Sequence, residues 1–118
     1  MILVDTSVWV DHLRSRNRAL VALLDDDRVL THPFVIGELA CGQLRNRREI
    51  LELLATLPGA QVAGHEDALA LVEGHRLFGR GIGWIDAHLL ASTLLSHARL
   101  LTRDRRLSRL ALEMGVSV

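Results

Sequence analysis

The sequence of 118 residues has no lysine and no tyrosine, a single cysteine and two prolines. One cysteine excludes an internal disulfide, and the position of Cys41 in an apolar helical pattern predicts a small core residue. The prolines lie far apart and 49% of the residues are hydrophobic, which argues against disorder. No apolar run approaches the roughly 18 residues of a membrane span, and Asp5 interrupts the first apolar residues before a signal peptide could form. We expect one globular domain, 1–118, in the cytoplasm.

Positive charge comes from arginine alone. The 14 basic residues balance 14 acidic ones, giving a net charge of zero at pH 7, which by itself argues weakly against nucleic-acid binding. The arginines are nevertheless grouped along the chain, in three sets: Arg14, Arg16 and Arg18; Arg45, Arg47 and Arg48; Arg103, Arg105, Arg106 and Arg109. The planar guanidinium suits phosphate. Ordinary solvated surface charge explains the three sets equally well.

The first residues organise the rest of the chain. Residues 1–4 are an unbroken apolar run, typical of a strand buried on both faces, and an amphipathic segment follows at once with Thr6 and Ser7 available to cap a helix. Parallel sheets bind ligands beyond the carboxyl ends of their strands. Asp5 therefore falls where chemistry is usually done.

Apolar runs alternate with helical periodicity along the whole sequence. The predicted strands are 1–4, 29–31, 60–62, 99–102 and 116–118, and the predicted helices begin near residues 6, 19, 33, 46, 66, 84 and 107. This alternation is typical of an α/β fold with right-handed crossovers. The sequence predicts a three-layer α/β/α sandwich with a five-stranded, mostly parallel sheet.

Three further acidic residues have unusual positions. Asp104 follows the strand predicted at 99–102 as Asp5 follows the first strand. Asp86 heads the inward-facing stripe of the helix that begins at Trp84, although an acid in the first turn can also simply favour the helix dipole. Glu38 follows Val35 by three residues and is predicted on the apolar side of its helix. If the first and fourth strands are neighbours, Asp5, Asp86 and Asp104 converge.

Converging carboxylates either share a proton or bind a cation, because like charges raise one another's pKa. Oxygen ligands without histidine or cysteine favour Mg²⁺ or Mn²⁺ over zinc. Such an ion polarises phosphoryl oxygens and generates a nucleophile from bound water, which suits attack on a phosphodiester. Thr6, Ser7 and Thr102 flank these acids and can hydrogen-bond to carboxylates or to metal-bound water. Capping and turn formation are their alternative roles.

The segment 79–83 alternates glycine with other residues and interrupts the helical pattern. It follows a helix, so it is not a dinucleotide-binding fingerprint. Two interpretations stay open: a flexible loop, or a loop that approaches phosphate before a helix N-terminus.

Four short motifs resemble those of PIN-domain ribonucleases. They are the strand ending in Asp5-Thr6-Ser7, the isolated Glu38, the segment Trp84-Ile85-Asp86-Ala87-His88-Leu89-Leu90-Ala91, and Leu101-Thr102-Arg103-Asp104. The resemblance covers essentially the whole chain, and the length is similar to that of VapC toxins from type II toxin–antitoxin pairs.

The resemblance implies RNA cleavage dependent on Mg²⁺ or Mn²⁺, a homodimer, and inhibition by a VapB-like antitoxin that inserts a segment into the acidic cleft. It assigns the four catalytic positions to Asp5, Glu38, Asp86 and Asp104, with Asp5, Asp86 and Asp104 as metal ligands and Thr6 and Thr102 at the hydroxyl positions. Many relatives carry a further acid and an aromatic residue where this chain has Arg106 and Leu107. We therefore expect fewer metal ligands, and we consider Arg80, Arg103 and Arg106 candidate RNA contacts.

Other functions are compatible with parts of this pattern. A receiver-like phosphoacceptor normally uses a lysine, and this chain has none. A PIN fold that binds RNA or a partner without turnover is the main alternative, and a DNA substrate stays open because metal-assisted attack does not distinguish the sugar. With few aromatic residues for base stacking, recognition is expected to depend on shape and backbone, which predicts a hairpin or another structured RNA.

Overall fold

The computed structural model describes residues 1–118, which form three strands and seven helices. The strands are β1 (Ile2–Val4), β2 (Val29–Leu30) and β3 (Arg99–Leu101). The helices are α1 (Thr6–Ser15), α2 (Arg18–Asp25), α3 (Pro33–Cys41), α4 (Arg47–Thr56), α5 (His65–Gly74), α6 (Trp84–Leu95) and α7 (Arg105–Glu113). No helix has the length and apolar character needed to cross a membrane.

The sheet is parallel and has the order β2-β1-β3. Leu3 of the central strand aligns with Leu30 on one side and with Leu100 on the other. All three residues of β1 are buried, which is why this strand reads as a continuous apolar run. The predicted adjacency of the first strand and the strand before Asp104 is confirmed.

The predicted count of five strands was wrong, because each edge of the sheet carries only a single bridge. Gly59 pairs with Thr31 at one edge, and Ser117 pairs with Leu100 at the other, both in parallel. Beyond Gly59, the N–H of Gln61 donates to the hydroxyl of Ser96, the C-cap residue of α6, at 2.8 Å, and the N–H of Ala63 donates to the hydroxyl of Ser92 on α6 at 3.0 Å. Helix side chains therefore satisfy backbone donors that a longer edge strand would have paired.

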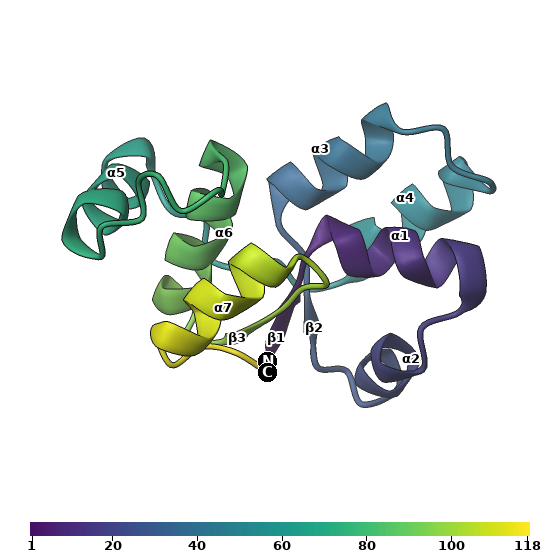
Figure 1. Cartoon of the computed structure of the whole chain (residues 1–118). Coiled ribbons are helices and arrows are strands. Elements are labelled where there is room, and N and C mark those ends of the chain that lie inside the picture. Colours follow the sequence, from purple (N-terminus) through teal and green to yellow (C-terminus); the bar gives the residue numbers. More distant parts are fainter.

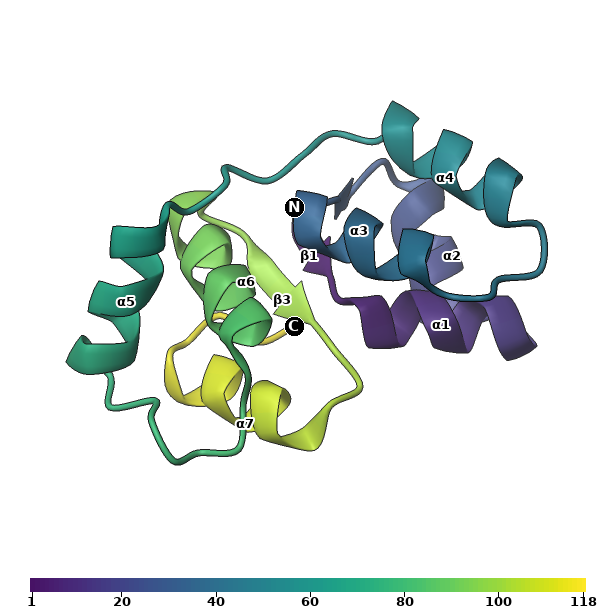
Figure 2. The ribbon, with the colours of Figure 1, turned by 90° about the horizontal axis from the view of Figure 1, so that it is seen from above.

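Helices cover both faces of the sheet. Figures 1 and 2 show α1 to α4 on one side of the strands and α5 to α7 on the other, so the three-layer prediction is confirmed. One cluster of 25 buried apolar residues fills both interfaces; it includes Trp9 and Leu20 on one side and Leu89 and Leu107 on the other.

Cys41 is exposed, contrary to the core position predicted for it. Helix α3 buries Val35 and Leu39, which lie one helical turn apart. Cys41 follows Leu39 by two residues, so it lies on nearly the opposite side of the helix. Helix α3 therefore has more apolar residues than its buried stripe can accommodate, and Cys41 is one of those left exposed.

Candidate active site

Asp5 lies directly after the central strand and is 6% exposed. It occupies the N-cap position of α1 but makes no side-chain capping bond. Instead, its Oδ2 atom accepts hydrogen bonds from the hydroxyls of Ser7 and Thr102, at 2.7 and 2.8 Å. Its Oδ1 atom accepts none of the hydrogen bonds within the protein. The carboxylate is thus fixed by one oxygen while the other stays available to a ligand.

Ser7 and Thr102 also join the end of β3 to the start of α1. Their hydroxyl oxygens are 3.3 Å apart. Ser7 Oγ accepts the backbone N–H of Arg103 at 3.0 Å, and Thr102 Oγ1 accepts that of Asp104 at 3.1 Å. Figure 2 shows the loop after β3 beside the first turn of α1. The predicted hydrogen bonds from Ser7 and Thr102 to an acidic side chain are therefore present, and they bring the segments of Asp5 and Asp104 together.

Asp104 is exposed and caps α7. Its Oδ1 atom accepts the backbone N–H groups of Arg106 and Leu107, at 2.9 and 3.1 Å. This capping bond orients the carboxylate at the end of the β3 segment and leaves Oδ2 without a hydrogen bond inside the protein. Structural capping and an open ligand position coexist in this one side chain.

Asp86 is half-buried in the first turn of α6, where its Oδ2 atom accepts the N–H of Gly83 at 3.1 Å. Burial raises the pKa of Asp86 above its usual value, and the negative charges of Asp5, Asp104 and Glu38 raise it further, whereas the Gly83 hydrogen bond acts in the opposite direction. All four predicted acids therefore share one electrostatic environment.

Glu38 is exposed, so the prediction that it lies on the buried side of its helix was wrong. It immediately precedes the buried Leu39 and falls at the margin of the apolar stripe. Its Oε1 atom accepts the hydroxyl of Thr6 at 2.7 Å, which links α3 to the first turn of α1. Glu38 also lines a hollow of about 530 Å³, whose other lining residues are Pro33, Phe34, Gly37, Cys41 and Ile85.

None of the four carboxylates is paired with an arginine. The ion pairs of the protein join Arg80 to Glu113 and Arg103 to Asp11. Four unpaired carboxylates near one another give this part of the surface excess negative charge, which attracts cations.

The donor set fits a hard divalent cation. No three His, Cys, Asp or Glu side chains lie close enough to hold one ion among them, so the acids do not form a closed cage of ligands. We call the surface around Asp5, Glu38, Asp86 and Asp104 the acidic cleft. Mg²⁺ commonly binds through one or two carboxylates and keeps several waters, which such a cleft permits. The carboxylate donors suit Mg²⁺ or Mn²⁺ better than zinc.

His32 was not singled out from the sequence, although it positions the helices of the site. The ring is fully buried. Its Nδ1 atom accepts the N–H of Phe34, and its Nε2 atom lies 3.0 Å from Ser92 Oγ on α6. His32 therefore caps the helix of Glu38 and connects it to the helix of Asp86. Its position just before Pro33, at a helix start, was the available signal.

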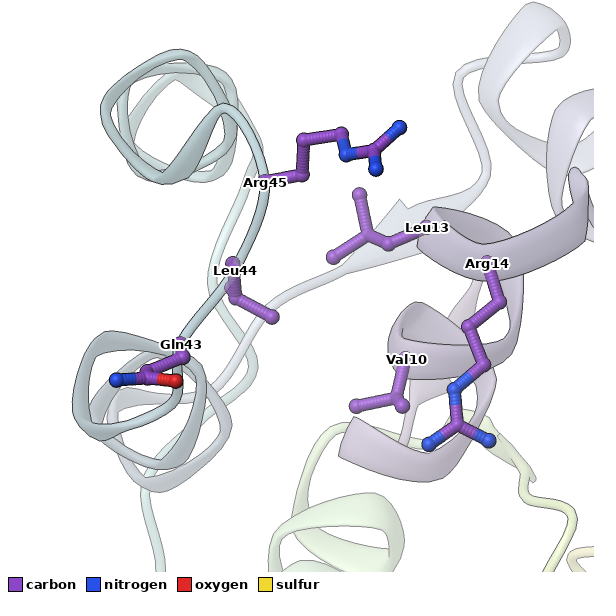
Figure 3. Close-up of a pocket in the computed structure, with 6 residues that line it drawn as sticks. All are labelled: Val10, Leu13, Arg14, Gln43, Leu44 and Arg45. Carbon is purple, nitrogen blue, oxygen red and sulfur yellow. The ribbon is translucent and has the colours of Figure 1, made fainter.

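The hollow between α1 and the turn before α4 has a different character. It measures about 390 Å³ and is lined by Val10, Leu13, Arg14, Gln43, Leu44 and Arg45. Figure 3 shows Val10, Leu13 and Leu44 directed into the space between the two segments. This hollow contains no carboxylate, so it is not the candidate catalytic site.

Comparison with known proteins identifies the family of this chain. The PIN domain family model matches residues 2–113. The whole chain aligns at 50% identity with 96% of ribonuclease VapC32 from Mycobacterium tuberculosis, in strain CDC 1551 / Oshkosh and in strain H37Rv. The crystal structure of PAE2754 from Pyrobaculum aerophilum superposes with a TM-score of 0.60 at 14% identity, over 97% of this chain and 88% of that one, which supports the fold. The chain belongs to the PIN domain family.

Proposed function

We propose that this protein is a VapC-type endoribonuclease, the toxin of a VapBC toxin–antitoxin pair, and that it cleaves RNA phosphodiester bonds in the cytoplasm. The observation that carries the proposal is the 50% identity to ribonuclease VapC32 along the entire chain. The four unpaired carboxylates around the ends of β1 and β3 supply a site suited to that chemistry.

Divalent-metal dependence is the general property of PIN-domain nucleases, and the residues of this chain suit Mg²⁺ or Mn²⁺. Asp5, Asp86 and Asp104 would hold the ion, one or two of them directly and the rest through bound water, because the three are not close enough to ligate one ion together. Glu38 would lie at the margin of the site. When bound, the ion supplies an activated water and polarises the phosphoryl group. Ser7 and Thr102 fix the orientation of Asp5.

Backbone and hydroxyl donors orient the other acids. The Gly83 N–H holds Asp86, and the Thr6 hydroxyl holds Glu38. Because the pKa of Asp86 is raised, this carboxylate holds a proton to higher pH than an isolated Asp, and a cation that binds there displaces that proton.

Two partners belong to the proposal. A VapB-like antitoxin with a basic segment would complement the excess negative charge of the cleft. A homodimer is supported by apolar side chains exposed on α5, on α6 and between them, namely Leu69, Phe78, Trp84, Leu94 and Leu95. Sedimentation equilibrium of the purified protein measures whether the homodimer forms. A monomer at micromolar concentration would contradict the homodimer.

Brief expression followed by sequencing of cut RNA ends tests the function. The intact protein should produce new ends at a small number of sites, in structured RNA such as a hairpin, and the variants Asp86→Ala and Asp5→Asn should produce none. Purified protein should cut the same RNA only with Mg²⁺ or Mn²⁺ added, and should spare a DNA of the same sequence. RNA binding without cleavage under any divalent ion would favour the alternative, a non-catalytic PIN-fold binding module.

A further inference from the structure

Four arginine side chains line one hollow beside the acidic cleft. The hollow measures about 250 Å³, and its lining residues are Arg80, Arg105, Arg106 and Arg109. Arg80 belongs to the glycine-containing loop before α6, whereas the other three lie in the first turns of α7. We call this feature the arginine pocket. No acidic or apolar side chain contributes to its wall.

The arrangement is electrostatically unfavourable for the protein alone. Arg105, Arg106 and Arg109 have no ion pair with any carboxylate. Arg109 follows the other two by four and three residues, a spacing at which like charges on a helix repel. Arg105 and Arg106 also lie in the first turn of α7, where the helix dipole disfavours cations. Three uncompensated charges kept together in this way indicate an anionic ligand.

The loop that contains Arg80 and Gly81 contacts α7 near both ends of that helix. Nη2 of Arg80 lies 2.9 and 3.0 Å from the two carboxylate oxygens of Glu113, which anchors the loop to the end of α7. Gly81 has φ +81°, and a Cβ atom there would lie 2.7 Å from Cδ of Arg106. The Arg106 side chain therefore runs directly along the glycine backbone, and a larger residue at position 81 would displace it.

The arginine pocket and the acidic cleft are built from the same two segments. Gly83, at the end of the loop, donates its N–H to Asp86. At the start of α7, Asp104 accepts the backbone N–H of Arg106. Each segment thus carries one acid of the cleft and part of the arginine wall, which sets the pocket next to the carboxylates. Arg103, in contrast, pairs with Asp11 and does not line the pocket.

We propose that the arginine pocket binds a backbone phosphate of the RNA strand adjacent to the phosphate that is cleaved. This inference rests on the proposed ribonuclease function and names the part of the substrate that the pocket holds. Guanidinium groups match the oxygens of a phosphodiester by paired hydrogen bonds. The phosphate neutralises the arginine repulsion while the acidic cleft receives the neighbouring linkage with its cation. Backbone contacts fix the register of a strand without reading its bases.

Salt-dependent RNA binding tests the arginine pocket. The experiment uses the Asp5→Asn protein in EDTA, so that the RNA is not cleaved. The affinity of this protein for a fluorescein-labelled hairpin RNA is measured from 50 to 300 mM KCl. When Arg106→Gln and Arg109→Gln are introduced into the Asp5→Asn protein, its RNA affinity should fall at least about 10-fold at 100 mM KCl. The slope of log K against log salt should fall in magnitude by about 0.7 for each phosphate that the variant no longer neutralises. Arg18→Gln, an exposed arginine on α2 at the far side of the sheet, is the matched control and should leave the slope unchanged.

Either of two results would contradict the proposal that the arginine pocket binds phosphate. One is an unchanged salt slope in the variant with Arg106→Gln and Arg109→Gln, and the other is an equal loss of RNA affinity in the Arg18→Gln control. Weaker binding of an antitoxin peptide with RNA binding intact would also overturn it, because the ligand would then be a protein. The nuclease proposal has a separate readout. Wild-type protein that cuts no RNA with Mg²⁺ or Mn²⁺ would remove that function, while the binding slopes would still decide whether the pocket contacts phosphate.

Discussion

The hydroxyl of Thr102 donates a 2.8 Å hydrogen bond to Asp5, a residue 97 positions earlier in the chain. This bond joins the ends of two neighbouring parallel strands and fixes the most buried acid of the site. The same oxygen accepts the backbone N–H of Asp104. One hydroxyl thus sets the positions of two of the proposed metal ligands.

We expect Thr102→Val to reduce kcat/KM on hairpin RNA by about 10-fold or more, since each misplaced carboxylate weakens ion binding and outer hydrogen-bond partners of metal ligands typically contribute roughly 10- to 100-fold. The free energy of unfolding should fall by about 1 kcal/mol because these hydrogen bonds are absent. Thr102→Ser keeps the hydroxyl and should retain most of the activity. Equal activity of the valine and serine variants would contradict the role assigned to this bond.

Thr6 should act through Glu38 alone. Thr6→Val removes the donor that orients the Glu38 carboxylate, so activity should fall severalfold, and less than in Glu38→Gln. In a double-mutant cycle, Thr6→Val should have almost no further effect once Glu38 is replaced by alanine. Additive losses would show that Thr6 contributes to catalysis independently of Glu38.

The Asp86→Asn variant separates stability from metal binding. The raised pKa of Asp86 reflects burial and repulsion by neighbouring carboxylates, so in EDTA the neutral amide should unfold at the same temperature as wild type or higher. Mg²⁺ should raise the Tm of wild-type protein, because a ligand that binds only the native state stabilises it. The increase should be much smaller in Asp86→Asn. Equal Mg²⁺-induced shifts would exclude Asp86 as a ligand.

Stability should fall as the pH drops from about 6.5 to 4 because of His32. Burial, with a further contribution from nearby His88, lowers the pKa of His32 from 6.5 to about 4. Between these values the unfolded chain binds a proton that the folded protein excludes, so this contribution is fully present above pH 6.5 and declines below it. The loss by pH 4 is on the order of 3 kcal/mol.

Urea unfolding of wild type and His32→Asn at several pH values measures this contribution. Carboxylates titrate in both proteins, so the difference between the two stability curves isolates the histidine. We expect the asparagine variant to be less stable at pH 7 and to approach wild type as the pH decreases. Parallel curves would contradict the assignment.

Gly81→Ala should reduce both stability and RNA affinity. The methyl group would collide with the Arg106 side chain, and the positive φ is unfavourable for alanine. Gly79→Ala is the matched control, because Gly79 has φ +71° but no atom within 4 Å of the added Cβ. Both variants should lose about 1 kcal/mol from backbone strain. Only Gly81→Ala should weaken RNA binding, and an equal loss in both would assign the effect to the backbone.

The strand that leads to Asp5 and the pairing of β1 with β3 could be predicted because buried parallel strands read as apolar runs and their carboxyl ends share one edge. Glu38 could not be placed correctly, because α3 is apolar around much of its surface and the pattern does not show which stripe is buried. The same ambiguity explains the error for Cys41. The length of an edge strand also depends on competing acceptors such as Ser92 and Ser96, whose hydroxyls bind backbone N–H groups 29 and 35 residues earlier in the sequence.

The arginine pocket and the contact of His32 with Ser92 depend on side chains from segments that only the fold brings together. Grouped arginines in the sequence suggested phosphate contacts, but not which members face one another. Arg103 does not line the pocket, because it pairs with Asp11, a residue 92 positions away. Arg80 does line it, although it lies in a loop that follows a different helix.

The single-residue bridges at the two sheet margins bear on self-association. An open sheet usually offers a row of unpaired N–H and C=O groups onto which another chain can add a strand. Here each outer segment pairs through one residue only, which leaves a very short template at each edge. Aggregation by strand addition is therefore disfavoured, and the homodimer that we propose would use helical surfaces.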